Sequence, residues 1–410
     1  MPSLNPVISQ LGRRLRLALI GGGPGSFIGA MHRQASRLDD RYELVAACLS
    51  SRPDVAVQAG RELGLPPERC YATGRDLIAA EAALALALAL APQGGGADVI
   101  AIMTPNDSHF LYAQAALEAG FDVICDKPMT NSVQEAQSLH ALVQQTGRVF
   151  CLTHNYTGYP MVRQAQAMVQ DGELGDIRLV QVEYVQGGRA KPGPGRRAWK
   201  EDPLRGGPSL VMGDIGSHAH NLLRFITGLE VAEVAAEVGA IVPGRVTHDY
   251  AGAMLRLAQR PGGVANNHSA GIVARGSFWV TQAAAGIENA LRIRVSGSLG
   301  TLEWQQETPQ QLSFKGLDQP AQLRTPNGPG TLPQSARASR IVAGHPEGFH
   351  ESFANLYSDV AEAIAARRSG EAPDPMCLLF PNSHDGLMGV KFVDAVIRSS
   401  VGNGAWVRCD

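Results

Sequence analysis

The first 150 residues alternate short apolar runs with longer, helix-like segments. The apolar runs lie at 15–20, 44–48, 99–103, 123–125 and 149–152, and the helix-like segments at 52–63, 76–91, 108–119 and 132–145. Near-continuous apolar strands that alternate with helices are typical of a parallel sheet covered by helices on both faces. The pattern therefore predicts an α/β domain with a doubly wound parallel sheet over residues 1–150.

The pattern changes after residue 150. Segments in which polar and apolar residues alternate lie at 177–184, 231–241, 250–257, 263–270, 290–296 and 301–305, and helix-like segments at 160–170, 216–227, 351–367 and 385–399. Such alternation indicates an antiparallel sheet with one open face. We predict a second, α+β domain over residues 151–410 with a large, mostly antiparallel sheet and flanking helices, and we expect 187–207 and 308–343 to be irregular.

The composition is that of an ordinary globular protein, with 18% charged residues, 44% hydrophobic residues and a formal net charge of −2. This balance gives no basic field, so nucleic acid and membranes are not expected partners. The Ala- and Leu-rich run at 79–91 is shorter than the about 20 residues of a membrane span, so we expect a buried helix there. Six scattered cysteines and an N-terminus without a signal segment favour a cytoplasmic location.

A glycine-rich segment at residues 21–29 follows the first apolar run. A turn of this kind between a strand and a helix lets backbone N–H groups approach a pyrophosphate. Gly21 and Gly23 fit the G-x-G-x-x-G spacing, but Ser26 occupies the third position and the next glycine is Gly29. The position of the segment after the first strand favours a dinucleotide site over a tight turn without a ligand.

The end of the second apolar run bears on cofactor choice. An acidic residue there binds the ribose hydroxyls of NAD, but the run ends in Ser50, Ser51 and Arg52 without one. The hydroxyls and the guanidinium could accept the 2′-phosphate of NADP, although Ser50 could also hydrogen-bond NAD. Both cofactors, NAD and NADP, therefore stay open.

Two further apolar runs end in polar segments. The third run leads into Thr104-Pro-Asn106 and His109, which could bind a ligand or cap the helix that follows. The fourth ends in Asp126-Lys127-Pro128. Ligands of open α/β sheets bind at the carboxyl ends of the strands, so Lys127 is placed to contact a ligand and, since lysine changes its charge readily on burial, to handle a proton.

Asp214 and His218 lie four residues apart in the segment 213–220 and would share one face of a helix. A histidine suits proton transfer near neutral pH, and a neighbouring carboxylate can orient it. A capped helix without catalytic function is the plain alternative. A metal site formed with His220 is less favoured, because His220 would face away from the other two side chains.

Together these motifs resemble those of the Gfo/Idh/MocA oxidoreductase family, over nearly the whole chain. The resemblance rests on the glycine segment, on Thr104-Pro-Asn106 with His109, on Asp126-Lys127-Pro128 in place of the usual E-K-P, and on Asp214-Ile-Gly-Ser-His218. It also includes Asn155-Tyr156 and the segment 345–353. Departures are Asp126, the displaced third glycine, and Asn221 where many members have aspartate.

The resemblance implies an N-terminal Rossmann domain that binds NAD or NADP, and a C-terminal domain that binds substrate and forms homodimers or homotetramers through its sheet. The implied cofactor-binding residues are Gly21, Gly23, Pro24, Gly25, Ser26, Phe27, Ile28, Ser50, Ser51, Arg52, Thr104, Pro105, Asn106, His109, Asp126, Lys127 and Asn155. The implied catalytic residues are Lys127, Asp214 and His218, and these three are also expected to contact substrate together with His154, Tyr156, Arg189, Trp199, Lys200 and Asp202. Trp199 could equally pack in the core.

The implied activity is NAD(P)-dependent oxidation of a ring hydroxyl of a sugar, glycoside or cyclitol to a ketone. His218 would take the hydroxyl proton, Asp214 would orient His218, and Lys127 would stabilise the reacting oxygen. Two alternatives remain open. One is transient oxidation by a retained cofactor that leads to glycoside cleavage or epimerisation, and the other is a non-catalytic dinucleotide-binding regulator.

Overall fold

The computed structural model describes residues 4–87, 95–193, 198–260 and 271–410. The described chain forms two compact units. The first contains residues up to Thr130, Gln134–Thr153 and Phe353–Gly386, and the second contains Asn131–Val133, His154–Ser352 and Leu387–Asp410. The sequence-based division at residue 150 assigned the whole C-terminal part to the second domain, whereas 353–386 packs with the first unit.

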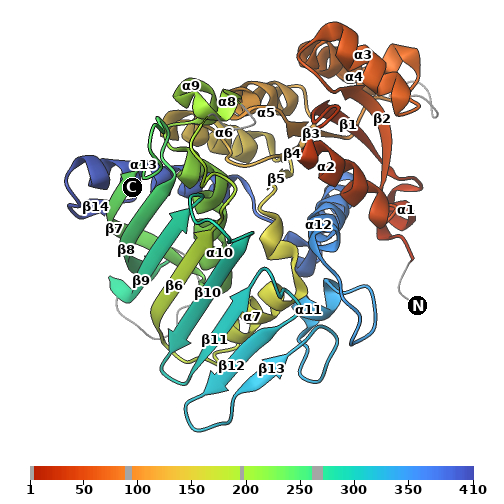
Figure 1. Ribbon diagram of the computed structural model, residues 1–410. Helices are drawn as coiled ribbons and strands as arrows, with labels where there is room; N and C mark the ends of the chain where they lie inside the picture. Colours follow the sequence, from red (N-terminus) through yellow and green to blue (C-terminus); the bar gives the residue numbers. More distant parts are fainter. Residues whose placement is uncertain (1–3, 88–94, 194–197, 261–270) are drawn as a thin grey trace. The chain divides into compact units, whose positions relative to one another are not determined.

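The first unit is built on a five-stranded parallel sheet in the order β2-β1-β3-β4-β5, so the predicted Rossmann sheet is confirmed (Figure 1). Its strands are β1 (Leu15–Gly21), β2 (Tyr42–Cys48), β3 (Val99–Met103), β4 (Asp122–Cys125) and β5 (Phe150–Leu152). Its helices are α1 (Pro6–Leu11), α2 (Phe27–Leu38), α3 (Pro53–Glu62), η1 (Pro67–Arg69), α4 (Gly74–Ala87), η3 (Asn106–Ser108), α5 (His109–Glu118), α6 (Val133–Thr146), η6 (Pro375–Leu378) and most of α12, whose bounds are given below.

The strand order reverses between β1 and β3, which are hydrogen-bonded neighbours. Gly21 at the end of β1 pairs with Met103 at the end of β3, and Ile102 pairs with Cys125 at the end of β4. The loops that follow these three strands therefore leave the sheet at one edge. In open α/β sheets this reversal point is where ligands bind.

The segment 353–386 joins the first unit through buried side chains. The hydroxyl of Tyr357 lies 2.7 Å from Nδ1 of His32, and the hydroxyl of Tyr42 donates to the carbonyl of Tyr357 at 2.7 Å. Burial lowers the pKa of His32 to about 4, so this ring is neutral at physiological pH. Arg367 donates to buried Asp122 at 2.6 Å. Since these partners are more than 200 residues apart, local pattern could not predict the packing.

The second unit contains a nine-stranded sheet in the order β13-β12-β11-β10-β6-β9-β8-β7-β14. All neighbours are antiparallel except β6 and β9, so the predicted mostly antiparallel sheet is confirmed. The strands are β6 (Ile177–Val185), β7 (Leu229–Gly239), β8 (Tyr250–Gln259), β9 (Ile272–Thr281), β10 (Ala290–Gly297), β11 (Gly300–Gln305), β12 (Leu312–Gly316), β13 (Gln322–Arg324) and β14 (Val407–Arg408).

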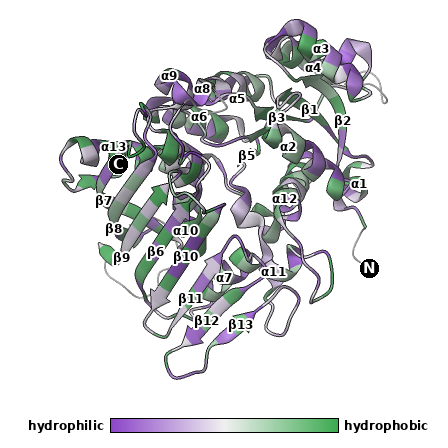
Figure 2. Cartoon of the chain, in the orientation of Figure 1, coloured by the Kyte–Doolittle hydropathy of each residue, from purple (hydrophilic) through white to green (hydrophobic). Residues whose placement is uncertain are grey.

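The remaining helical segments are η4 (Asn155–Gly158), α7 (Pro160–Gln170), α8 (Ala198–Glu201), α9 (Pro203–Gly206), a π-helical turn η5 (Met212–Gly216), α10 (Ser217–Thr227), α11 (Pro333–Arg337), α12 (Phe349–Ser369) and α13 (Ser383–Val401). Figure 1 shows α7 and α10 on one face of the nine-stranded sheet. Burial alternates along the strands, as in β10, where Leu291, Ile293 and Val295 are buried. Figure 2 shows this alternation as bands of hydrophobic and hydrophilic colour. The helices thus cover one face and leave the other open.

Three sequence-based expectations about local structure need comment. The strand predicted at 263–270 lies outside the described residues, and β9, which lies beside the central strand β6, was missed. The region 308–343 was expected to be irregular but contains β12, β13 and α11. The Ala- and Leu-rich helix was expected to be buried, but Leu84 and Leu86 are 37% and 78% exposed. Alternating Ala and Leu does not give the spacing of a single buried helical stripe, and α4 buries its N-terminal half instead.

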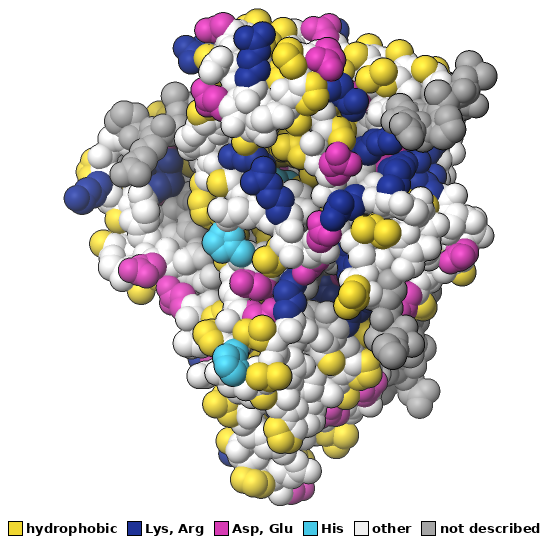
Figure 3. All heavy atoms as spheres, turned by 90° about the vertical axis from the view of Figure 1, so that its right-hand side faces the viewer, with side chains coloured by type: hydrophobic (Ala, Val, Ile, Leu, Met, Phe, Trp, Pro, Cys, Tyr) yellow, Lys and Arg dark blue, Asp and Glu magenta, His cyan; other side chains and the backbone are white. Residues whose placement is uncertain are grey.

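The described surface carries both signs of charge. Figure 3 shows Lys and Arg side chains interspersed with Asp and Glu side chains on the face drawn, consistent with the small net charge. Across the residues that the structure describes, no helix is both long and apolar enough to span a membrane.

A buried ion pair in the second unit gives a testable prediction about stability. Arg224 at the end of α10 is 1% exposed and donates Nε and Nη2 to the carboxylate of Glu230, at 2.6 and 2.7 Å. Arg224→Met would leave the carboxylate of Glu230 with the partly exposed Arg260, whose Nε donates to it at 3.1 Å. We therefore predict a loss in the free energy of unfolding of about 3 kcal/mol, at the lower end for a broken buried pair. Urea denaturation measures this change in the free energy of unfolding. Arg398→Met, which removes an exposed pair with Asp394, should cost less than about 1 kcal/mol, and equal losses for both variants would contradict the account.

Candidate active site

The glycine-rich turn after β1 has a backbone that other residues could not adopt without strain. Gly21, Gly22 and Gly25 have φ values of +85°, +69° and +76°. A Cβ at Gly23 would lie 2.0 Å from the carbonyl oxygen of Leu49. A Cβ at Gly25, in contrast, would meet nothing within 4 Å. The turn is therefore packed tightly against the sheet and open at Gly25, which fits the close approach of a pyrophosphate.

The displaced third glycine has a packing role. Ser26 is the N-cap of α2, and its Oγ accepts from the backbone N–H of Gly29 at 3.1 Å. A Cβ at Gly29 would lie 1.9 Å from the carbonyl oxygen of Gly22, so only glycine lets α2 contact the turn. Arg33 also donates to the carbonyl of Gly22, at 2.6 Å. Pro24, Phe27 and Ile28 belong to the same turn and the first helical residues, and Phe27 is 59% exposed.

The turn after β2 has the predicted polar character. The backbone N–H of Arg52 donates to Oγ of Ser50 at 3.1 Å, and the side chains of Ser51 and Arg52 are exposed. Arg52 is also the residue before α3. The residues that could bind a ribose or a 2′-phosphate thus lie in one turn of the first unit.

His109 fixes the loop after β3 to the loop after β4. Its Nε2 lies 2.9 Å from the carbonyl oxygen of Thr104, and its Nδ1 lies 2.8 Å from that of Pro128. The ring is only 1% exposed, so His109 acts in this structure as a buried cross-link between the two loops. Pro105 and Asn106 lie in the same half-buried loop.

Lys127 lies in the loop that His109 fixes. The Lys127–Pro128 peptide bond is cis, and the side chains of Asp126 and Lys127 are half-buried. Oδ1 of Asp126 accepts from the backbone N–H of Lys127 at 2.8 Å and from the hydroxyl of Thr153 at 3.1 Å. Asp126 thus determines the course of the backbone at Lys127. The first unit therefore brings together the glycine turn, the Thr104 loop and Lys127 at one edge of its sheet.

Asp214 and His218 belong to the second unit, in the π-helical turn and the first turn of α10. Oδ1 of Asp214 accepts from Lys200 Nζ at 2.7 Å, and Oδ2 accepts from Nε2 of Gln282 at 3.0 Å. His218 is 8% exposed, and its Nδ1 lies 3.3 Å from Nδ1 of His154. The structure thus places His154, Lys200, Asp214 and His218, all predicted site residues, in one polar cluster.

The aromatic ring of Tyr156 completes the surroundings of His218. Its centroid lies 4.8 Å from that of His218, and its hydroxyl lies 2.5 Å from the hydroxyl of Tyr184. Asn155, the neighbouring residue, is 3% exposed, and its Nδ2 is buried without a hydrogen-bond partner. An unpartnered amide of this kind is suited to donate to a ligand.

The other predicted substrate-binding residues have different surroundings. Arg189 pairs with Glu201, and Asp202 caps the short helix α9 through the backbone N–H of Leu204. Trp199 is half-buried, and the ammonium group of Lys200 lies 5.8 Å from the centroid of its ring. Arg189 and Asp202 therefore have structural partners in the segment between β6 and η5, which was predicted to be irregular and contains α8 and α9.

Four further polar residues of this cluster were not predicted from the sequence. A chain of hydrogen bonds runs from Asp214 through Gln282, Gln186, Asn289 and Tyr184 to Tyr156. Gln186 and Gln282 directly follow β6 and β9, whose last residues, Val185 and Thr281, are paired in parallel register. A polar residue directly after each of two paired strands could have indicated these site residues. Recognising Gln282 in this way required the prediction of β9, which the sequence pattern did not give.

His220 was the third residue of the less favoured metal site. Its ring stacks on Phe392 with centroids 4.3 Å apart, and burial lowers its pKa well below the ordinary value. Within the described part of the chain, no group of three or more His, Cys, Asp or Glu residues could hold a metal ion. His220 thus has the surroundings of a neutral core histidine.

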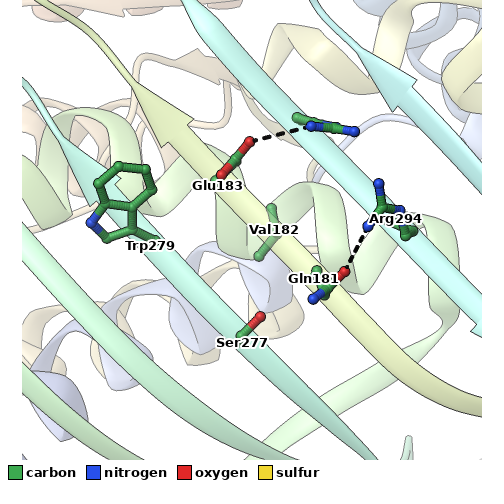
Figure 4. Close-up of a pocket in the computed structure, with 7 residues that line it drawn as sticks. Gln181, Val182, Glu183, Ser277, Trp279 and Arg294 are labelled. Atoms are coloured by element: carbon green, nitrogen blue, oxygen red, sulfur yellow. Dashed lines mark hydrogen bonds and ion pairs between the residues drawn. The ribbon is translucent and has the colours of Figure 1, made fainter. Parts of the chain in front are cut away.

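A separate hollow lies on the open face of the nine-stranded sheet. It has a volume of about 210 Å³ and is lined by Gln181, Val182, Glu183, Ser277, Trp279, Arg292 and Arg294. Figure 4 shows these side chains on neighbouring strands, with ion pairing between Glu183 and Arg292 and a hydrogen bond from Arg294 to Gln181. The hollow is part of the sheet surface and does not include the polar cluster around Asp214.

The fold and the glycine turn define the class of protein. Residues 15–154 match the model described as the oxidoreductase family with an NAD-binding Rossmann fold, and residues 162–303 match the GFO/IDH/MocA C-terminal domain. The N-terminal unit is thus the NAD-binding domain of an oxidoreductase, as predicted.

Similar proteins extend this assignment to the whole chain. An oxidoreductase from Sinorhizobium meliloti is 43% identical, with 96% of this chain and 99% of that chain covered and a TM-score of 0.83. An inositol dehydrogenase homologue from Azotobacter vinelandii, solved with NADH and myo-inositol, is 33% identical, with 97% and 98% covered and a TM-score of 0.84. Levoglucosan dehydrogenase of Pseudarthrobacter phenanthrenivorans is 28% identical over 57% of this chain and 56% of that protein. The chain belongs to the Gfo/Idh/MocA family of oxidoreductases, so the resemblance is confirmed.

The close packing of Gly29 gives a testable prediction. In Gly29→Ala the added methyl group would overlap the carbonyl of Gly22, so the turn must move away from α2. We predict that the Kd for NAD+, measured by calorimetry, rises at least about tenfold, which corresponds to 1.4 kcal/mol.

The control is Gly389→Ala in α13, where a Cβ meets nothing within 4 Å. This substitution should leave the Kd unchanged and stabilise the helix by about 0.5–1 kcal/mol. Unaltered NAD+ affinity of Gly29→Ala would show that the turn does not need this glycine.

Proposed function

We propose that the protein is an NAD(P)-dependent dehydrogenase that oxidises a ring hydroxyl of a sugar, glycoside or cyclitol to a ketone. The observation that supports this most directly is the polar cluster of the buried His154 and His218 with the half-buried Lys200 and Asp214. Buried polar groups are costly unless they bind one another or a polar ligand. A ligand with many hydroxyls suits such a cluster, and the homologue from Azotobacter vinelandii was solved with myo-inositol.

The proposed roles follow from the chemistry of alcohol oxidation. His218 takes the hydroxyl proton, because a neutral imidazole is a suitable base near neutral pH. Lys127 donates a hydrogen bond to the reacting oxygen and stabilises its developing negative charge. Asp214 lies in the turn directly before His218, and its negative charge stabilises the imidazolium that forms. A bound nicotinamide supplies the hydride acceptor.

The proposed cofactor contacts lie mainly in the first unit. The backbone of the glycine turn and the N-terminus of α2 bind the pyrophosphate, and the turn at Ser50 and Arg52 binds the adenosine ribose. Asn155 offers its unpartnered amide. Since the turn after β2 has hydroxyls and a guanidinium but no carboxylate, we propose that both NAD and NADP are accepted.

The activity test uses a panel of aldoses, glycosides and inositols with NAD+ or NADP+, and follows absorbance of the reduced cofactor. We predict that Lys127→Met lowers kcat/KM by about 10²–10³-fold and that His218→Asn lowers it by about 10²–10⁴-fold. Lys315→Met, which changes an exposed lysine of β12, is the control and should retain wild-type turnover.

Other outcomes of the same assay separate the alternative functions. If protein that demonstrably binds cofactor reduces it with none of the substrates in the panel, the dehydrogenase proposal is contradicted. Product release without net reduction, by protein purified with cofactor bound, would support transient oxidation. A non-catalytic regulator would still respond to dinucleotide binding when Lys127 is replaced by methionine.

We also propose that a second copy of the chain covers the open sheet face. That face exposes Leu179, Met254 and Trp279 at 55%, 56% and 42% beside the Arg292–Glu303 ion pair. A patch with apolar centres and both signs of charge is self-complementary, as the interface of a two-fold homodimer must be. The proposed oligomer is a homodimer, or a homotetramer that uses this interface.

Light scattering after gel filtration tests this interface. We predict a mass of two or four chains for the wild type and of fewer chains for Trp279→Glu, because the substitution places an unpaired charge in the apolar patch. Leu111→Glu, an equally exposed apolar residue of α5 in the first unit, is the control and should not change the mass. A monomeric wild type would refute the proposal.

A further inference from the structure

The contact between two buried histidines has chemical consequences for the proposed base. His154 and His218 are 2% and 8% exposed, and their Nδ1 atoms lie 3.3 Å apart. The rings meet edge to face, with centroids 5.0 Å apart and an interplanar angle of 80°. This arrangement is compatible with a hydrogen bond from one ring to the other.

Such a contact constrains the tautomers of both rings. A neutral imidazole has one N–H donor and one acceptor nitrogen. In a contact between two Nδ1 atoms, one ring must bear its proton on Nδ1 and the other must bear it on Nε2. Two cations are disfavoured, because like charges at this distance in a buried site repel strongly. The pair therefore has two neutral arrangements, which differ in the ring that donates.

Only one of these arrangements makes His218 a base at its second nitrogen. If His218 donates its Nδ1–H to His154, its Nε2 is unprotonated and can act as a base. If His154 donates, Nε2 of His218 bears a proton and cannot accept one. A wrong tautomer of this kind can lower turnover by about 10⁴-fold in an enzyme that uses a histidine base.

Polar residues around the pair form a hydrogen-bonded network. The hydroxyl of Tyr184 donates to Asn289 at 2.8 Å and lies 2.5 Å from the hydroxyl of Tyr156. The oxygens of Asp214 accept from Lys200 and Gln282. The contact at Nδ1 of His218 that carries the argument is the one with Nδ1 of His154, at 3.3 Å.

We propose that His154 is a positioning residue that accepts the Nδ1–H of His218 and thereby keeps Nε2 of His218 unprotonated, so that it can take the substrate proton. The inference rests on the proposed function and deepens it. In the step itself, the C–H hydrogen leaves with its electron pair as hydride to the oxidised nicotinamide. The hydroxyl proton moves to Nε2 of His218, and the C–O bond becomes a carbonyl. The imidazolium keeps its Nδ1–H bonded to His154.

Two substitutions at His154 distinguish the roles of its two ring nitrogens. Asparagine places its amide near the position of Nδ1, so His154→Asn retains an acceptor for His218. Glutamine places its amide near Nε2, so His154→Gln loses that acceptor. If His154 acted instead by binding substrate through Nε2, the order of the two variants would be reversed.

The first measurement needs neither a substrate nor turnover. Long-range ¹H–¹⁵N spectra of protein labelled at histidine, at about pH 8.5 and thus two units above the ordinary histidine pKa of about 6.5, report which ring nitrogen bears the proton. The resonances of His218 are those missing in His218→Asn. We predict Nδ1–H for His218 in the wild type and in His154→Asn, and mixed tautomers in His154→Gln. A wild-type His218 protonated at Nε2 would overturn the proposal, whether or not any sugar is oxidised.

The second measurement is turnover with the substrate found in the panel. We predict that His154→Gln lowers kcat by about 10²-fold or more with a small change in KM, and that His154→Asn stays within about tenfold of the wild type. His140→Gln is the matched control, since His140 is a half-buried histidine of α6 bonded to Ser383. Wild-type kcat in His154→Gln, or a loss in His154→Asn alone, would refute the proposal. A wild type without turnover would refute the proposed function and leave the tautomer result decisive for this inference.

Discussion

The parallel pairing of β1 with β3 and of β3 with β4 is the constraint on which the first unit depends. Because Gly21 is in register with Met103, and Ile102 with Cys125, three loops leave the sheet at one edge. The glycines after β1 then permit a tight turn, and His109 joins the other two loops through the carbonyls of Thr104 and Pro128. The position of Lys127 thus follows from strand register and from one buried histidine.

The second unit also has one parallel strand pair, whose two ends lie at the same edge of a sheet that is otherwise antiparallel. The parallel pair β6 and β9 ends in Gln186 and Gln282, and these amides connect Tyr184 to Asp214. The burial of so many polar groups is stable because each accepts or donates within the cluster. The same network reaches Tyr156, whose ring packs against that of His218.

The sequence predicted the Rossmann sheet well, because each of its strands is a continuous apolar run between helices. It did not predict β9, whose apolar residues form two short runs, 272–274 and 278–280, separated by Arg275, Gly276 and Ser277. It also missed the strands within 308–343, which are only five and three residues long. The packing of 353–386 on the first unit depends on pairs such as His32 and Tyr357, which no local pattern reveals. Among the site residues, Lys127 and His218 came from motifs, whereas Gln186 and Gln282 required the pairing of distant strands.

The central claim is that a ring hydroxyl is oxidised by direct hydride transfer. The most direct test is a single turnover with a substrate from the panel that is deuterated at its ring carbons, followed by mass spectrometry of the recovered cofactor. The account predicts one deuterium per reduced nicotinamide, because the hydride leaves the carbon that bears the reacting hydroxyl. Reduced cofactor without deuterium, or cofactor that stays oxidised with every substrate, would contradict it.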